Sequence, residues 1–369
     1  MLGGYGTFGG RLARLLADDA RVSLQIAGRS PGKAQAFAGT LGAAAMGVRV
    51  DRDADLIAQL APLAPEVVVD ASGPFQAYGA APYRVLEAAL AVSADYLDLA
   101  DGAAFVEGVA AYDAGAKAAG RLALSGLSTV PALSFAAARS LAADLDVVED
   151  LVTGIAPTPY AGMGLSVVRA VLGYAGKPVV LTRGGRVTTA RATVETRRRV
   201  IAPPGVRPLP SRLFSLVDCP DLRLASQAWP GLRSVWTGGA PVPEALHRIL
   251  IALAWLRLPL GGCGPLFHFV SRKVRWGEHG GGMFVEVAGR RGGERVRRSW
   301  ELIAEGDDGP FIPAMAAAAV IRRRLAGRPP APGARAATHE LTLADFAPLF
   351  AQRQIVTGVR ELDSASVRV

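Results

Sequence analysis

The sequence predicts an α/β protein. Its first third should form a doubly wound parallel sheet of the Rossmann type, and its second half mixes strands and helices. Two observations lead to this prediction. Short apolar strands alternate with helical segments through the first third of the chain, and a glycine pattern lies at the mouth of the first predicted helix. The length of 369 residues fits two domains better than one.

The composition supports a folded protein with a sizeable core. Half of the residues are hydrophobic and a fifth are charged, which excludes global disorder. Two cysteines, Cys219 and Cys263, are too few for a disulfide framework or a four-ligand zinc site. We therefore expect a reduced, cytoplasmic setting, and the N-terminus has no features of a signal peptide.

The charge is unevenly distributed along the chain. Residues 1–150 hold 11 basic and 17 acidic groups, a net charge of −6, whereas residues 151–369 hold 30 and 15, a net charge of +15. We expect a solvated basic surface, and the alternative is attraction to an anionic substrate, carrier or membrane surface. No basic motif interleaved with aromatic residues is present, so nucleic acid is not an expected partner.

The first element carries the main functional signal. Gly4, Gly6 and Gly9 form a G-x-G-x-x-G pattern before a predicted helix over 10–17 and a buried strand over 22–27. In this setting the three glycines allow a tight turn, a close approach to a pyrophosphate and close packing of the helix on the sheet. The helix N-terminus then presents N–H groups to the anion. The alternative is a glycine-rich turn without a ligand. The candidate cofactor-binding residues of this loop are Gly4, Tyr5, Gly6, Thr7, Phe8 and Gly9.

The strand before this loop is unusually short. Only Met1, Leu2 and Gly3 precede the first glycine of the pattern, where a central strand commonly supplies about five or six residues. We expect either a stunted first strand or a true start that lies upstream.

The end of the second predicted strand selects the cofactor. NAD-binding proteins commonly place an acidic residue there, whereas this chain has Arg29 followed by Ser30, with Lys33 one helical turn further on. A guanidinium can pair with a 2′-phosphate in bidentate fashion, so we predict NADP, with NAD as the less favoured alternative. Asp51, after a short third strand over 47–50, is suited to the adenine edge.

The alternation continues with strands predicted over 67–69, 96–99 and 121–125 and helices over 83–91 and 105–119. Ligands bind beyond the carboxyl ends of such strands, so the residues that follow them should face one crevice. These residues are Ala71, Ser72, Gly73, Pro74, Phe75, Asp98, Asp101 and Ser128.

Three segments resemble the saccharopine dehydrogenase-like family of NADP-binding oxidoreductases: GGYGTFGG from Gly3, GPFQAYG from Gly73 and YLDLADG from Tyr96. GLSTVPALS from Gly126 resembles the family's loop before the helix that leaves the nucleotide domain. The resemblance covers about the first 135 residues. It implies a Rossmann NADP-binding domain (1–130), an α+β substrate and dimerisation domain (131–305) and a C-terminal helical segment (306–369) that could pack back on the first domain. It also implies that Gly73, Pro74 and Phe75 line the nicotinamide end of the cofactor.

Other catalytic patterns are absent from the sequence. Short-chain reductases use a Tyr-x-x-x-Lys pattern, hydrolases a G-x-S-x-G elbow and metalloproteases an H-E-x-x-H helix, and none occurs here. The four histidines are scattered, so we predict no metal site, and we interpret Trp276–Gly282 as a plain turn. Hydride transfer needs positioning and at most one proton donor, for which Tyr78 and Asp101 are the candidates. Asp101 could instead only cap the following helix.

The second half contains predicted strands over 179–182, 187–194, 213–217 and 284–288, and helices over 165–173, 244–256 and 314–324. The apolar stretch Ile249–Leu260 is too short to span a membrane. We expect it to be a buried helix, and the alternative is an interfacial hydrophobic patch. The leading functional hypothesis is an NADP-dependent oxidoreductase that acts as a homodimer on a small imine, carbonyl or activated alkene. The alternative is a non-enzymatic or membrane-peripheral nucleotide-binding protein.

Overall fold

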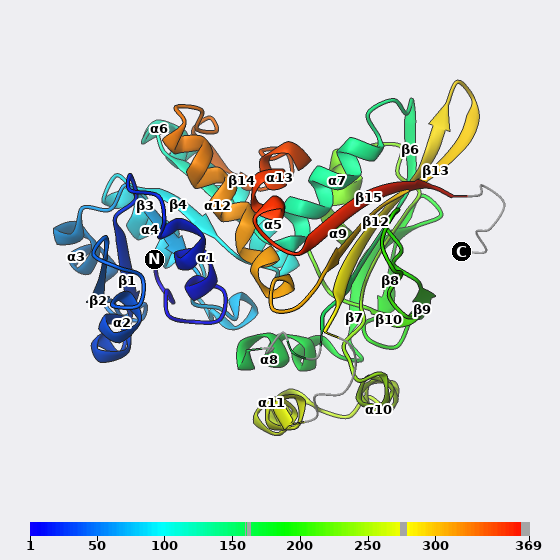
Figure 1. Cartoon of the computed structure of the whole chain (residues 1–369), viewed down its shortest axis with the longest axis horizontal. Coiled ribbons are helices and arrows are strands. Elements are labelled where there is room, and N and C mark those ends of the chain that lie inside the picture. Colours follow the sequence, from blue (N-terminus) through cyan, green and yellow to red (C-terminus); the bar gives the residue numbers. More distant parts are fainter. Residues whose placement is uncertain (159, 161–163, 274–278, 363–369) are drawn as a thin grey trace. The chain divides into compact units, whose positions relative to one another are not determined.

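The computed structural model describes residues 1–158, 160, 164–273 and 279–362. The chain divides into two compact units, which Figure 1 shows together. The first unit comprises Met1–Ala132 and Phe311–Leu341, and the second comprises Leu133–Pro310 and the residues from Thr342 onward. Each unit has its own sheet.

The sheet of the first unit is entirely parallel. Its strands are β2 (Ala45–Arg49), β1 (Leu24–Gly28), β3 (Val67–Asp70), β4 (Asp95–Asp98), β5 (Leu122–Ser125) and β14 (Gly333–Ala336). Leu2 joins β1 to β3 through parallel bridges to Ala27 and Asp70. The expected first strand is thus reduced to one bridging residue. Successive strands are added on one side of Leu2 as far as β2 and then on its other side from β3 onward, so this point is the topological switch of a doubly wound sheet.

Helices cover both faces of this sheet. Val68, Tyr96 and Ala123 pack into one core cluster with α3 and α4. Their neighbours along each strand, such as Val69 and Leu97, are also buried, and these point to the opposite face because side chains alternate along a strand. The helices of the unit are α1 (Gly9–Leu16), α2 (Pro31–Ala38), α3 (Leu56–Leu60), α4 (Arg84–Ala91), α5 (Ala103–Gly108), α6 (Asp113–Ala118) and α12 (Ile312–Leu325).

The second unit is built on a seven-stranded sheet. Its strand order is β15 (Ile355–Glu361), β13 (Glu294–Ala304), β12 (Gly281–Arg291), β6 (Val147–Ala156), β11 (Ser234–Gly239), β10 (Arg212–Leu216) and β9 (Thr196–Arg199). Only the β6–β11 pair of this sheet is parallel. The hairpin β7 (Pro178–Arg183) and β8 (Arg186–Arg191) forms a separate two-stranded sheet.

Two groups of helices complete the second unit. The first group, which packs beside the large sheet, is α7 (Ser134–Leu141), α9 (Asp221–Ala228) and α13 (Leu343–Ala351). The second group is α8 (Leu165–Tyr174), α10 (Glu244–Trp255) and α11 (Gly264–Lys273), which share a small core of their own. No helix among the described residues combines the length and the apolar character needed to cross a bilayer.

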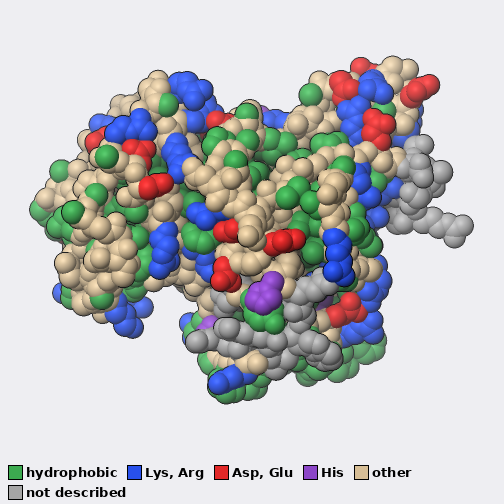
Figure 2. Space-filling view, in the orientation of Figure 1, with side chains coloured by type: hydrophobic (Ala, Val, Ile, Leu, Met, Phe, Trp, Pro, Cys, Tyr) green, Lys and Arg blue, Asp and Glu red, His purple; other side chains and the backbone are tan. Residues whose placement is uncertain are grey.

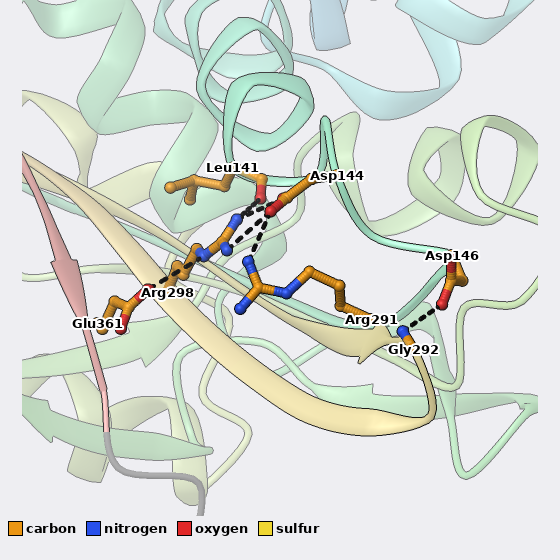
Figure 3. A network of polar contacts seen from close by, with 7 residues as sticks. All are labelled: Leu141, Asp144, Asp146, Arg291, Gly292, Arg298 and Glu361. Carbon is orange, nitrogen blue, oxygen red and sulfur yellow. Dashed lines mark hydrogen bonds and ion pairs between the residues drawn. The ribbon is translucent and has the colours of Figure 1, made fainter.

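A polar network fixes the start of β6 to the β12–β13 hairpin (Figure 3). The Asp144 carboxylate accepts hydrogen bonds from Arg298 at 2.5 and 3.0 Å and from Arg291 at 2.9 Å. Both arginines hold the pKa of Asp144 below its usual value. Because half-buried Arg298 also donates a hydrogen bond to the Leu141 carbonyl, this guanidinium ties α7 to the sheet.

The structure confirms the predicted fold class and differs from the sequence predictions in two places. The segment 306–369 is neither one body nor wholly helical, because α12 and β14 belong to the first unit whereas α13 and β15 belong to the second. The stretch Ile249–Leu260 is not a buried helix, since Ile249, Trp255, Leu256 and Leu258 are exposed. In α10 only one side is covered, where His247 contacts Ser215 of β10 and where Leu250 and Ala254 pack against α8.

Candidate functional site

The glycine loop connects Leu2 to α1 at the switch point of the first unit. A Cβ on Gly9 would lie 2.3 Å from the Gly3 carbonyl oxygen, so this position accepts only glycine without a shift of the backbone. A Cβ on Gly6 would meet the same oxygen at 3.0 Å and almost nothing else, because Gly6 is exposed. The close contact between Gly3 and Gly9 therefore closes the loop, and the backbone at Gly6 stays exposed to solvent. Helix α1 begins at Gly9, and its first N–H groups have no acceptor within the helix.

The end of β1 is covered by the side chain of Tyr5. A Cβ on Gly28 would overlap the Tyr5 ring, and the Tyr5 hydroxyl accepts a hydrogen bond from the Ser30 N–H at 3.3 Å. Arg29 and Lys33 are exposed and Ser30 is half-buried. All three predicted 2′-phosphate residues thus lie at the carboxyl end of β1, before or within the first turn of α2, as the Rossmann arrangement requires.

Asp70, at the end of β3, is the buried centre of a hydrogen-bond cluster. Its carboxylate accepts bonds from the Ser72 hydroxyl at 2.5 Å, from the Ser72 N–H at 3.0 Å and from the Tyr78 hydroxyl at 3.1 Å. Burial raises the pKa of Asp70, although these bonds oppose the shift. Burial and the nearby Asp70 charge also raise the pKa of Tyr78. Tyr78 is thus a fixed member of the cluster and a weaker acid than a free tyrosine.

Arg52 joins this cluster and was not predicted from the sequence. Its guanidinium carbon lies 3.2 Å from the centre of the Tyr78 ring, a cation–π contact. Its Nε and Nη2 atoms are buried and have no hydrogen-bond partner among the described residues. Arg52 directly follows Asp51, whose carboxylate accepts a bond from the Asp53 N–H at 3.1 Å and so shapes the turn after β2. The only sequence signal was the position of Arg52 at a strand end.

The predicted site residues in the segment after β3 differ in their burial and in the direction of their side chains. Gly73 and Pro74 are half-buried and joined by a cis peptide bond, and Ala71 is also half-buried. A Cβ on Gly73 would meet nothing closer than 3.6 Å, so space remains beside this backbone. Phe75 instead points inward, where its ring packs at 5.0 Å from both Tyr78 and Phe105. The Phe75 ring therefore supports the segment after β3 from the interior of the unit.

The end of β4 carries two carboxylates with different environments. Asp98 is fully buried and accepts hydrogen bonds from the Gly126 N–H at 2.8 Å and the Ala100 N–H at 2.9 Å, and burial raises the pKa of Asp98 to about 7. Asp101 is half-buried and accepts a bond from the Gln76 amide at 3.0 Å. The two carboxylates thus differ in role: Asp98 binds the β5 loop to β4, whereas Asp101 contacts Gln76 in the segment after β3.

The second unit offers no comparable catalytic cluster among the residues described. A groove of about 270 Å³ lies over its large sheet, but the arginines that line it are compensated. Arg199 pairs with Glu286 at 3.1 Å and Arg360 with Glu301 at 2.7 Å. His247 is buried against Ser215. No group of residues suited to a metal ion occurs in the described ranges. Of the predicted turn at Trp276–Gly282, residues 276–278 lie outside those ranges, and Gly281 and Gly282 begin β12.

Comparison with known proteins establishes the class of fold first. The L-glutamate-forming saccharopine dehydrogenase of Saccharomyces cerevisiae, solved in its apo form, matches 98% of this chain and 99% of its own with a TM-score of 0.67 at 13% identity. The chain therefore has the fold that the sequence motifs predicted.

More distant matches are a probable dehydrogenase from Thermotoga maritima and the WlbA dehydrogenase from Thermus thermophilus. The first covers 93% of this chain and 90% of its own with a TM-score of 0.46 at 10% identity. The second covers 94% and 92% with a TM-score of 0.42 at 14% identity. No family model matches the sequence, and no curated protein matches it.

Proposed function

We propose that this chain is an NADP-dependent oxidoreductase that transfers hydride to or from a small imine, carbonyl or activated alkene. The observation that carries the proposal is the Gly4–Gly9 loop at the switch point of a parallel sheet, ending at the N-terminus of α1. Exposed Gly6 leaves room there for a pyrophosphate to approach the backbone. A bound nicotinamide would supply or accept the hydride.

Arg29 and Ser30 are proposed to bind the 2′-phosphate. Both follow β1, and no acidic residue stands at this strand end to favour an unphosphorylated ribose. Arg52 adds a second cation near the crevice, and its unpartnered Nε and Nη2 atoms suit an anionic or carbonyl acceptor. The residues present therefore fit NADP better than NAD.

Asp101 is the proposed proton donor. It contacts Gln76 in the segment after β3, whereas Tyr78 has its hydroxyl committed to Asp70 and its pKa raised. We propose that Tyr78 holds the segment after β3 in place, together with Ser72. With a substrate identified, Asp101→Asn should lower kcat about 100-fold, whereas Tyr78→Phe should lower it less than tenfold.

The cofactor proposal is tested by calorimetric titration of the whole chain with NADPH and with NADH. NADPH should bind at least about tenfold more tightly, and Arg29→Ala should remove most of this difference by weakening NADPH alone. Arg186→Ala, an exposed arginine on β8, is the matched control and should leave both affinities unchanged. Equal affinities of the wild-type protein for the two nucleotides would refute the NADP preference, and no binding of either would refute the function.

The remaining expectations are a homodimer and a cytoplasmic, reduced setting.

A further inference from the structure

The helices α10 and α11 of the second unit present an exposed apolar surface. Trp255 and Phe269 have 62% and 60% of their surface exposed. The outer apolar face consists of Ile249, Trp255, Leu256, Leu258, Leu266 and Phe269. Figure 2 shows hydrophobic side chains beside lysine and arginine at the edge where Figure 1 places these two helices.

The outer apolar face is separate from the hydrophobic core that these helices form. The same helices, with α8, bury a separate cluster on their inner side that includes Leu172, Leu250 and Ala254. In α11, Leu266 and Phe269 are three residues apart and so share one side of the helix, while Phe267 packs inward against the cluster. Both helices are thus apolar on two sides, and only one side is used by the fold. Large exposed apolar patches of this kind mark interaction surfaces.

The charge along α10 and α11 is mainly basic, with Glu244 at the start of α10 as the acidic exception. Residues 245–273 contain four Lys or Arg residues and no Asp or Glu. Arg257 and Lys273 are exposed, and Arg248 also pairs with Glu244 at the start of α10 at 2.8 Å. The surrounding half of the chain, residues 151–369, carries a net charge of +15.

We propose that the outer apolar face docks on an anionic lipid surface, with α10 and α11 lying in the plane of the membrane. Aromatic and leucine side chains would enter the headgroup boundary while the cations contact lipid phosphates. A second copy of this chain would fit the outer apolar face less well than an anionic lipid surface. In a two-fold contact the face would meet itself, and Arg257 and Lys273 would face equal charges with no acidic residue in 245–273 to compensate them.

The proposal is tested by co-sedimentation of the whole chain with vesicles of phosphatidylcholine, alone or with about 30% phosphatidylglycerol. We expect binding to the anionic vesicles, at least about tenfold weaker binding to the neutral ones, and weakening of the former by salt. The double variant Trp255→Ser with Phe269→Ser should lower the partition coefficient about tenfold or more, and Arg257→Glu should lower it for anionic vesicles only.

Matched controls lie on strand β8, where Val187 is 77% exposed beside Arg186. Val187→Ser and Arg186→Glu should bind vesicles as the wild-type chain does, and circular dichroism should show that all variants are folded. Equal binding by the wild-type chain and the double variant would overturn the proposal, as would absence of vesicle binding. It would also be overturned if the wild-type chain self-associated without lipid and the double variant did not, since the face would then join two copies.

Discussion

At the scale of single residues, the first unit is characterised by two buried carboxylates at strand ends. Asp70 and Asp98 end neighbouring strands, are both wholly buried, and hold the loops that form the crevice through backbone N–H groups. Burial raises the pKa of each, because the ionised form loses its hydration. The crevice is thus shaped by groups that weaken the fold when they ionise.

Asp98→Asn should flatten the dependence of stability on pH. Below the ordinary pKa of aspartate Asp98 is protonated in both states. As the pH rises toward about 7 it ionises only in the unfolded chain. The free energy of unfolding therefore falls over this window, by up to roughly 4 kcal/mol, and is constant above it. Urea unfolding at several pH values should show a smaller fall for Asp98→Asn than for the wild type.

The control for this prediction is Asp53→Asn, at an exposed aspartate whose nearest ion-pair contact is 4.0 Å long. That variant should keep the wild-type pH profile. If Asp98→Asn did the same, the carboxylate would not be the source of the pH dependence.

At the scale of elements, two glycines of the same loop are expected to have different roles, Gly9 in stability and Gly6 in nucleotide binding. A Cβ on Gly9 would overlap the Gly3 carbonyl at 2.3 Å, whereas a Cβ on exposed Gly6 would meet that oxygen at 3.0 Å and little else. Gly9→Ala should lower the free energy of unfolding by about 1–3 kcal/mol, because its Cβ cannot fit without a backbone shift. Thermal unfolding monitored by circular dichroism checks this.

Gly6→Ala should instead reduce nucleotide affinity with little loss of stability, because its Cβ would occupy the side proposed for the pyrophosphate. Calorimetric titration with NADPH measures the effect. Gly32→Ala in α2, where a Cβ would touch nothing within 4 Å, is the neutral control. Unchanged NADPH affinity in Gly6→Ala would place the pyrophosphate elsewhere.

At the scale of the whole molecule, the first unit is assembled from two distant parts of the chain. The buried helix α12 packs on α1, where Arg322 bonds the Leu15 carbonyl at 3.0 Å, and β14 pairs with β5 at the sheet edge. A chain that ends at Pro310 would leave these surfaces open. It should therefore aggregate or lose cooperative unfolding, which expression trials and thermal melts would reveal. A soluble truncated chain with the wild-type melting temperature would contradict the dependence.

The sequence by itself determined the order of strands and helices in residues 1–130 and the candidate cofactor residues among them. The glycine spacing, the alternation of strands and helices, and Arg29 after β1 are local signals, because strand ends and helix starts depend on a few neighbouring residues. The strands predicted near Val67, Tyr96 and Arg121 occur as β3, β4 and β5, and the proposed cofactor residues follow Leu2, β1, β2 and β3.

Only the tertiary structure decided the rest. Long strands such as β6 and β13 were not predicted, and β14 and β15 form where distant strands offer an open edge for hydrogen bonding. Arg52 stacks on Tyr78 although 26 positions separate them in the chain, a contact no local pattern encodes. The exposure of Trp255 likewise depends on which side of α10 the fold covers. Periodicity reports that a helix is apolar, whereas packing decides how much of that apolar surface is buried.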